Sequence, residues 1–207
     1  MSENVLNPNI MDQNTMSEEF IAKKKSRKPL LFIAMLSMTM MFIGLSSAYI
    51  VSKNSSGSTW AEISLPPAFL MATISIVLSS VLVHFAVKKA KSGDFGTTTK
   101  LMFGGLILGI VFTVLQFVGF DQLVELGHFA AGSQSTAATS YIYAIVILHL
   151  GHMVGALISL IVVCLRLNFK KYSKDNILGI ELAEMFWHFL GILWVYLYIF
   201  LNTMNAV

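Results

Sequence analysis

Two groups of ionisable side chains lie inside or beside apolar stretches of this chain, where such groups are rare and often functional. The first group is His149 and His152, three residues apart within one apolar run. In a helix this spacing places both imidazoles on the same face. The pair could serve as ligands to a metal ion or a haem. The structural alternative is two neutral imidazoles hydrogen-bonded to neighbouring helices.

The second group is Glu181, Glu184 and His188, at the start of the last apolar run. Spacings of four and seven residues bring all three near one helix face. A Glu that precedes a His by one turn is the favourable order, and carboxylates suit the positive end of a helix dipole. We expect either a capped helix start at the membrane surface or a polar contact to a partner subunit, a lipid headgroup or a proton-entry region.

His149 and His152 alone do not supply the ligand set that a closed metal site requires. A transmembrane bis-haem cytochrome needs histidines that face one another in pairs, but His84 and His188 lie at a different depth from His149 and His152. The single Cys164 excludes an internal disulfide and centres with two thiolates. Phosphate loops, hydrolase elbows and zinc-protease motifs are absent from the sequence. The sequence therefore predicts no catalytic, cofactor-binding or metal site.

Five long apolar runs must position these side chains. The chain has 207 residues, of which 56% are hydrophobic and 12% charged, whereas soluble domains carry about 25% charged residues. A bilayer core about 30 Å thick needs about 20 apolar residues in a helix. We therefore predict an all-α integral membrane protein, a bundle of five transmembrane helices within a membrane domain of residues 29–207. The predicted spans are residues 29–51, 66–87, 101–120, 141–165 and 182–201, with Pro29 and Pro66 at helix starts.

The basic residues predict the topology. All Lys and Arg residues except Lys53 lie before the first run, between the second and third, or between the fourth and fifth. This places the N-terminus inside and the C-terminus outside. Residues 1–28 are expected to be a polar cytoplasmic tail, partly disordered. Lys170, Lys171 and Lys174 are expected to contact anionic lipid headgroups. Because the basic residues lie beside the membrane-spanning runs and anchor them, nucleic acid is not an expected partner.

Small residues predict how the helices pack. Close approach of backbones drives helix association in lipid, and two small-residue motifs offer it, Gly105-x-x-x-Gly109 and Gly151-x-x-x-Gly155. These motifs suit packing within the bundle or docking on a larger membrane partner. The lone amide of Gln116 is expected to form an interhelical hydrogen bond.

The stretch from Glu181 to Trp194 resembles the last-helix motif of subunit III of the haem–copper respiratory oxidases. That motif has a Glu, three small residues, two aromatics, Trp-His-Phe and a further Trp. The segment His149–Gly155 is similar to the family's His-Gly-Leu-His-Val segment, residues 65–80 to its second helix, and Tyr49 to an aromatic that closes its first. The resemblance covers most of the chain.

Two positions depart from the family pattern. The usual mid-helix carboxylate after a serine in the first of these helices is replaced here, in the pair Ser37-Met38, and an Asp common after the Trp-His-Phe motif is Gly191. Seven-helix members also bind lipid between two additional N-terminal helices. This chain has the five-helix form.

The resemblance implies a non-catalytic subunit of a proton-pumping cytochrome c oxidase in a bacterial inner membrane, which reduces O₂ to water. It implies catalytic subunit I, subunits II and IV, phospholipid and a larger respiratory supercomplex as partners, with haem and copper held by those subunits. Implied structural contacts are His149, His152, Glu181, Glu184, Trp187, His188 and Trp194. Two alternatives remain: the third subunit of a quinol oxidase, and a stand-alone small transporter or adaptor, against which the unbroken spans count.

Overall fold

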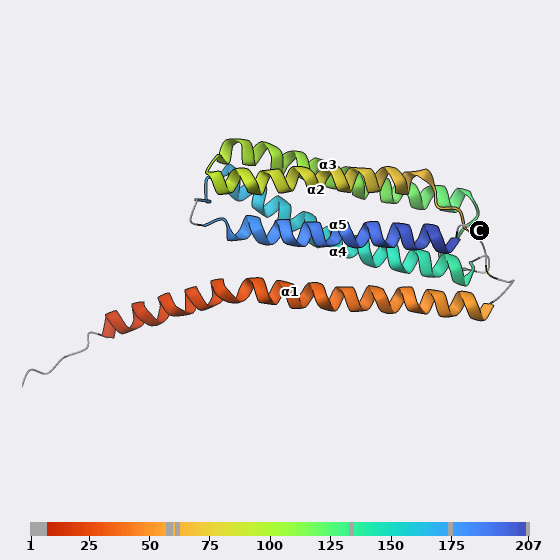
Figure 1. Cartoon of the computed structure of the whole chain (residues 1–207), viewed down its shortest axis with the longest axis horizontal. Coiled ribbons are helices and arrows are strands. Elements are labelled where there is room, and N and C mark those ends of the chain that lie inside the picture. The colour runs from red at the N-terminus through yellow and green to blue at the C-terminus, as the bar shows by residue number, and fades with distance from the viewer. Residues whose placement is uncertain (1–7, 57–59, 61–62, 133–134, 174–175, 206–207) are drawn as a thin grey trace, which may run out of the picture. The chain divides into compact units, whose positions relative to one another are not determined.

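The computed structural model describes residues 8–56, 60, 63–132, 135–173 and 176–205, and side chains between Ser26 and Met204. Within these residues it contains five helices and no strand beyond an isolated bridge (Figure 1). The helices are α1 (Pro8–Ser56), α2 (Pro67–Ser92), α3 (Phe95–Glu125), α4 (Ala137–Asn168) and α5 (Leu178–Asn205). All five are long and apolar enough to cross a membrane. The predicted fold class, an all-α membrane protein with five spans, is confirmed.

Helix α1 differs from the prediction at its start. The sequence places Pro29 at a helix start after a polar tail, but α1 begins at Pro8 and Pro29 lies inside it. The residues between the two prolines include good helix formers such as Glu and Lys, and transmembrane helices tolerate an internal proline. The chain divides into two compact units, residues 1–38 and residues 39–207, so α1 belongs to both. Every site described below lies in the second unit.

The connection between α2 and α3 is two residues long. Gly93 ends α2 in the left-handed conformation, at a φ of 87°, and its backbone N–H caps the carbonyls of Lys89 and Ala90. Asp94 then caps α3 by accepting a hydrogen bond from the Thr97 N–H at 3.1 Å. The side-chain and backbone hydrogen bonds of Thr97 hold the pKa of the Asp94 carboxyl below its ordinary value.

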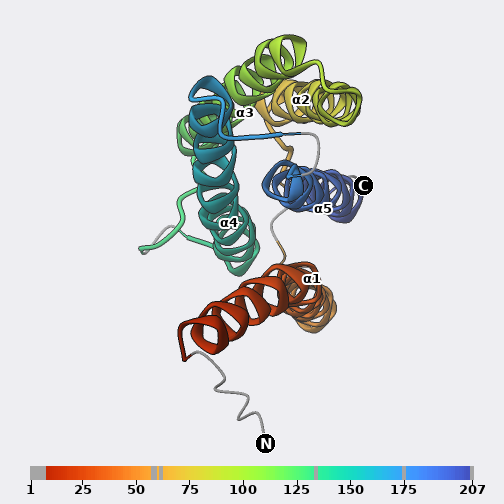
Figure 2. The ribbon, with the colours of Figure 1, turned by 90° about the vertical axis from the view of Figure 1, so that its left-hand side faces the viewer.

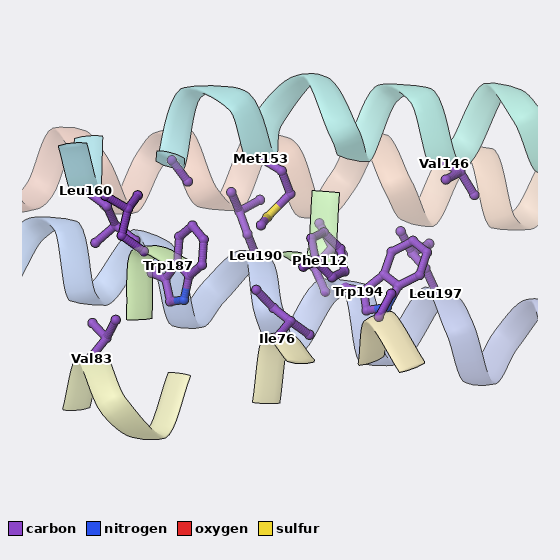
Figure 3. Packing of buried hydrophobic residues seen from close by; sticks show 14 of the residues in the cluster. Ile76, Val83, Phe112, Val146, Met153, Leu160, Trp187, Leu190, Trp194 and Leu197 are labelled. Atoms are coloured by element: carbon purple, nitrogen blue, oxygen red, sulfur yellow. The ribbon is translucent and has the colours of Figure 1, made fainter. Parts of the chain in front are cut away.

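Helices α2 to α5 form a closed ring of contacts. Helix α2 contacts α3 and α5, and α4 contacts the same two helices; Figure 2 shows this arrangement end-on. Large apolar side chains fill the space between the four helices (Figure 3). Trp187 and Trp194 of α5 are the largest of the fully buried side chains, and Phe112 and Met153 pack with them. These two tryptophans organise the core around which the candidate site residues lie.

Candidate functional site

Two glycines of α3 pack tightly against side chains of α2 and α5. A Cβ atom on Gly105 would lie 2.7 Å from Val83 Cγ2, and one on Gly109 would lie 2.5 Å from Trp187 Cη2. Both positions therefore accept only a hydrogen atom in the present packing. The second motif behaves differently, because a Cβ on Gly151 or Gly155 would meet no atom within 4 Å. Those two glycines face outward from α4.

Hydrogen bonds join the same helices inside the bundle. Trp187 Nε1 donates to Ser79 Oγ at 3.1 Å, and Ser79 Oγ donates to the Gly105 carbonyl at 2.7 Å. Trp194 Nε1 donates to Thr73 Oγ1 at 3.0 Å. A buried indole needs a partner for its N–H group, and α2 supplies a hydroxyl to each. The two tryptophans named by the last-helix motif are thus structural links between α5 and α2.

His149 lies in the core inside an aromatic enclosure. Its side chain is buried, with ring centroids 5.3 Å from Trp194, 6.1 Å from Phe42 and 6.3 Å from Phe112. Neither ring nitrogen has a hydrogen-bond partner among the residues that the structure describes. The expected hydrogen bond from His149 to a neighbouring helix is therefore not formed within this part of the chain. We also expected an interhelical hydrogen bond from Gln116. Its amide is buried, and neither its oxygen nor its nitrogen has a hydrogen-bond partner among the described residues.

His152 is held differently from His149. Its Nδ1 lies 2.7 Å from the carbonyl oxygen of Leu148, on its own helix, and its ring contacts Phe42 with centroids 5.9 Å apart. The two histidines thus both touch Phe42, as their spacing on one face predicts. The expected bond from His152 to a neighbouring helix is replaced by one within α4.

The polar group at the start of α5 gains a member that the sequence does not place there. His84 of α2 brings its Nδ1 to 3.0 Å from Glu184 Oε1, and His188 Nε2 lies 3.6 Å from the same oxygen. One ligand atom from each of these three residues lies within 4.8 Å of the others. Beside them, Lys91 Nζ lies 3.5 Å from Glu181 Oε1. Two interhelical polar contacts therefore join this end of α2 to α5.

An apolar groove runs from this polar cluster along α2 and α5. It encloses about 590 Å³ and is lined mainly by Ile76, Ser80 and His84 of α2 and by His188, Gly191 and Ile192 of α5. A Cβ on Gly191 would lie 3.2 Å from Ser80 Oγ. Gly191 therefore lines the groove close to Ser80 without adding a side chain to it.

A second cavity lies beside the loop between α4 and α5. It encloses about 460 Å³, and Lys100, Lys170 and Tyr172 contribute to its lining. Burial raises the pKa of the Tyr172 hydroxyl. Lys170 and Lys171 are exposed, whereas Lys174 lies outside the described residues. Lys170 lines this cavity and Lys171 is its neighbour in the sequence. Both belong to the group of three lysines for which we expect lipid contact.

Five apolar helices and a core held by buried aromatics define a multi-pass helical membrane protein. The family model of cytochrome c oxidase subunit III matches residues 10–205. The chain belongs to the cytochrome c oxidase subunit III family, and so is a subunit of a terminal oxidase complex of the respiratory chain.

Three proteins named cytochrome c oxidase subunit 3 are similar to this chain over most of its length. Cytochrome c oxidase subunit 3 of Corynebacterium diphtheriae is 30% identical over 174 residues, 81% of this chain and 83% of that protein. The subunit of the same name from Bacillus sp. strain PS3 is 27% identical over 172 residues, 82% of this chain and 81% of that protein. That of Drosophila melanogaster is 29% identical over 131 residues, 63% of this chain and 47% of that protein.

Proposed function

We propose that this chain is the non-catalytic third subunit of a proton-pumping oxidase that transfers electrons from cytochrome c to O₂. In this role it stabilises catalytic subunit I, holds phospholipid beside it and sustains proton uptake, in company with subunits II and IV. The oxidase lies in a bacterial inner membrane, with the N-terminus of this chain inside. The basic residues Lys88, Lys89, Lys170 and Lys171 support that orientation, because the helix order places them at one end of the bundle.

The observation that carries the non-catalytic role is the setting of His149. Aromatic rings of Phe42, Phe112 and Trp194 surround its imidazole. A bound metal ion takes further ligands besides one imidazole, and the rings of Phe42, Phe112 and Trp194 supply none. The histidine pair of α4 therefore supports a packing role, and the redox centres are assigned to partner subunits.

The outer face of α4 supports docking on subunit I. Gly151 and Gly155 are open to a neighbour, and Val154 and Ile158 beside them are exposed. Small residues allow the backbones of two transmembrane helices to approach closely. We assign this face to a helix of the catalytic subunit.

The second cavity supports the lipid role. Lys100 and Lys170 carry two positive charges to its lining, and each charge near an anionic membrane surface contributes about 1 kcal/mol. A phospholipid phosphate beside these lysines is the proposed occupant.

The test is purification of the complex through a streptavidin-binding tag on this chain, in a mild detergent. We expect a large haem-containing partner, haem a bands in the reduced-minus-oxidised spectrum, and oxidation of reduced cytochrome c. Replacing Gly151 or Gly155 with Leu should lower the haem recovered per tagged chain at least tenfold. Val114→Phe, an enlargement at an exposed site on α3, is the matched control and should recover haem normally.

A colourless, partner-free preparation of the unmodified chain would contradict the proposal. The alternative within the same superfamily, a quinol oxidase, would show itself by oxidation of quinol and not of cytochrome c. Family membership favours either oxidase over a stand-alone transporter or adaptor.

A further inference from the structure

The side chains of His84, Glu184 and His188 converge from two helices on one point. Glu184 Oε1 lies 3.0 Å from His84 Nδ1 and 3.6 Å from His188 Nε2. In a tetrahedral site with bonds of 2.0–2.1 Å, neighbouring ligand atoms are separated by about 3.3 Å. The two separations from Glu184 Oε1 bracket that value, and all three ligand atoms lie within 4.8 Å of one another. Side-chain rotations would therefore bring the three atoms to a single ion.

We propose that His84, Glu184 and His188 bind a divalent transition-metal cation of the zinc type. Two imidazoles and one carboxylate are a ligand set that zinc takes with a fourth, open position. A cation here would bridge α2 to α5 across the mouth of the apolar groove. This proposal does not depend on the role of the chain in the oxidase.

The location of His84 supports a ligand role. By helix rise, about 1.5 Å per residue, His84 lies about 12 Å inside the end of α2, on a turn whose neighbours Val81 and Phe85 are exposed apolar side chains. Ionisable groups at such positions require partners. The exposed fraction of its side chain is 63%, against 17% for Glu184 and 30% for His188. The two α5 side chains are therefore partly enclosed by their neighbours, whereas the exposed His84 has space to rotate toward an ion.

Neighbouring charges set the expected strength of binding. Glu184 supplies one negative charge, and the nearby Glu181 is engaged by Lys91 at 3.5 Å. Lys88 follows His84 by one turn and repels a dication. We therefore expect micromolar affinity, weaker than that of a structural zinc site with thiolate ligands.

The experiment is a Co²⁺ titration of the full chain in detergent, stripped with a chelator and carrying a tag without histidine. We expect one Co²⁺ per chain, a visible absorption band from the bound Co²⁺, and displacement by Zn²⁺. His188→Ala, Glu184→Gln and His84→Ala should each weaken binding at least tenfold. His128→Ala removes a histidine of the α3–α4 connection and should bind as the unmodified chain does.

Equal affinity in the unmodified chain and the three variants, or no Co²⁺ uptake at millimolar concentration, would overturn the proposal. Helix content by circular dichroism is measured alongside. His84→Ala removes an exposed side chain, so the bundle should keep its fold. Weaker Co²⁺ binding by this variant would therefore report the loss of a ligand and not a loss of fold.

Discussion

Trp187 donates its indole proton to Ser79 Oγ across 3.1 Å, inside the bundle where both side chains are fully buried. Because Ser79 donates in turn to the Gly105 carbonyl at 2.7 Å, one chain of hydrogen bonds connects α5, α2 and α3. Hydrogen bonds between transmembrane helices contribute about 0.6 kcal/mol on average and up to about 2 kcal/mol. A second hydrogen bond, from Ser75 Oγ to the Leu108 carbonyl at 2.9 Å, joins α2 to α3 about one turn away.

Ser79→Ala should lower the free energy of unfolding by about 1–2 kcal/mol, because it leaves the Trp187 N–H buried without a partner. Unfolding in detergent by titration with a denaturing surfactant measures the change. Trp187→Phe and the double variant complete a mutant cycle. If the losses in free energy of unfolding of the two single variants simply add, the hydrogen bond contributes no coupling energy. The two side chains would then interact only through packing.

Gly109→Ala should destabilise the bundle by about 1–3 kcal/mol, because the new methyl group would collide with the Trp187 ring. The matched substitution is Gly151→Ala, where the structure offers open space. It should leave the stability of the isolated chain unchanged or slightly higher, since Ala favours a helix. Thermal unfolding of both variants in the same detergent compares them. Equal losses at the two sites would contradict the packing described for α3.

The fold was predictable from the sequence because lipid imposes a simple rule on each span. Apolar length alone locates five helices, and their basic connections suggest an orientation. Helix ends were less predictable: α3 begins at Phe95 and not near Leu101, because Gly93 and Asp94 supply the caps that define its start. The apolar run predicts only the part of the helix that lies in the hydrocarbon core, and not its ends.

The candidate site was predictable only where its members lie on one helix. Spacing along α5 relates Glu184 to His188, but nothing in the sequence pairs His84 with them, since that contact exists only once α2 meets α5. Similarly, the close fit of Gly109 against Trp187 depends on two distant segments. The expected hydrogen bond of Gln116 failed for the same reason: the partner of a lone amide depends on which helices surround it.

His149→Leu should preserve or raise the stability of the bundle by about 1 kcal/mol. It replaces two buried nitrogens that have no hydrogen-bond partner among the described residues with an apolar group of similar size. His149→Ala should instead lower stability, because it leaves a cavity, and should speed loss of oxidase activity during turnover. Both variants should retain the haem spectrum of the assembled complex. Loss of haem absorbance from an otherwise assembled His149→Leu complex would reinstate a ligand role.

Asp94→Asn should reduce the sensitivity of the bundle to acid. The folded-state pKa of Asp94 is lowered by its hydrogen bonds with Thr97, so its stabilising contribution is present above the unfolded pKa of about 3.9. That contribution is lost as the pH falls toward the lower folded-state pKa. Thermal midpoints measured from about pH 6 to pH 3 should therefore fall more steeply for the unmodified chain than for the variant. Parallel curves would show that the carboxylate adds nothing beyond a neutral cap.

The contact between Gly109 and Trp187 also orders events during biosynthesis. Helix α3 is synthesised before α5. The surface of α3 around Gly109 therefore enters the bilayer before the Trp187 ring that covers it. A nascent chain arrested before α5 would expose this surface to other membrane proteins and to quality-control proteases. Only once α5 has been inserted can Trp187 cover Gly109, so the packing described above is complete only when the last helix is in place.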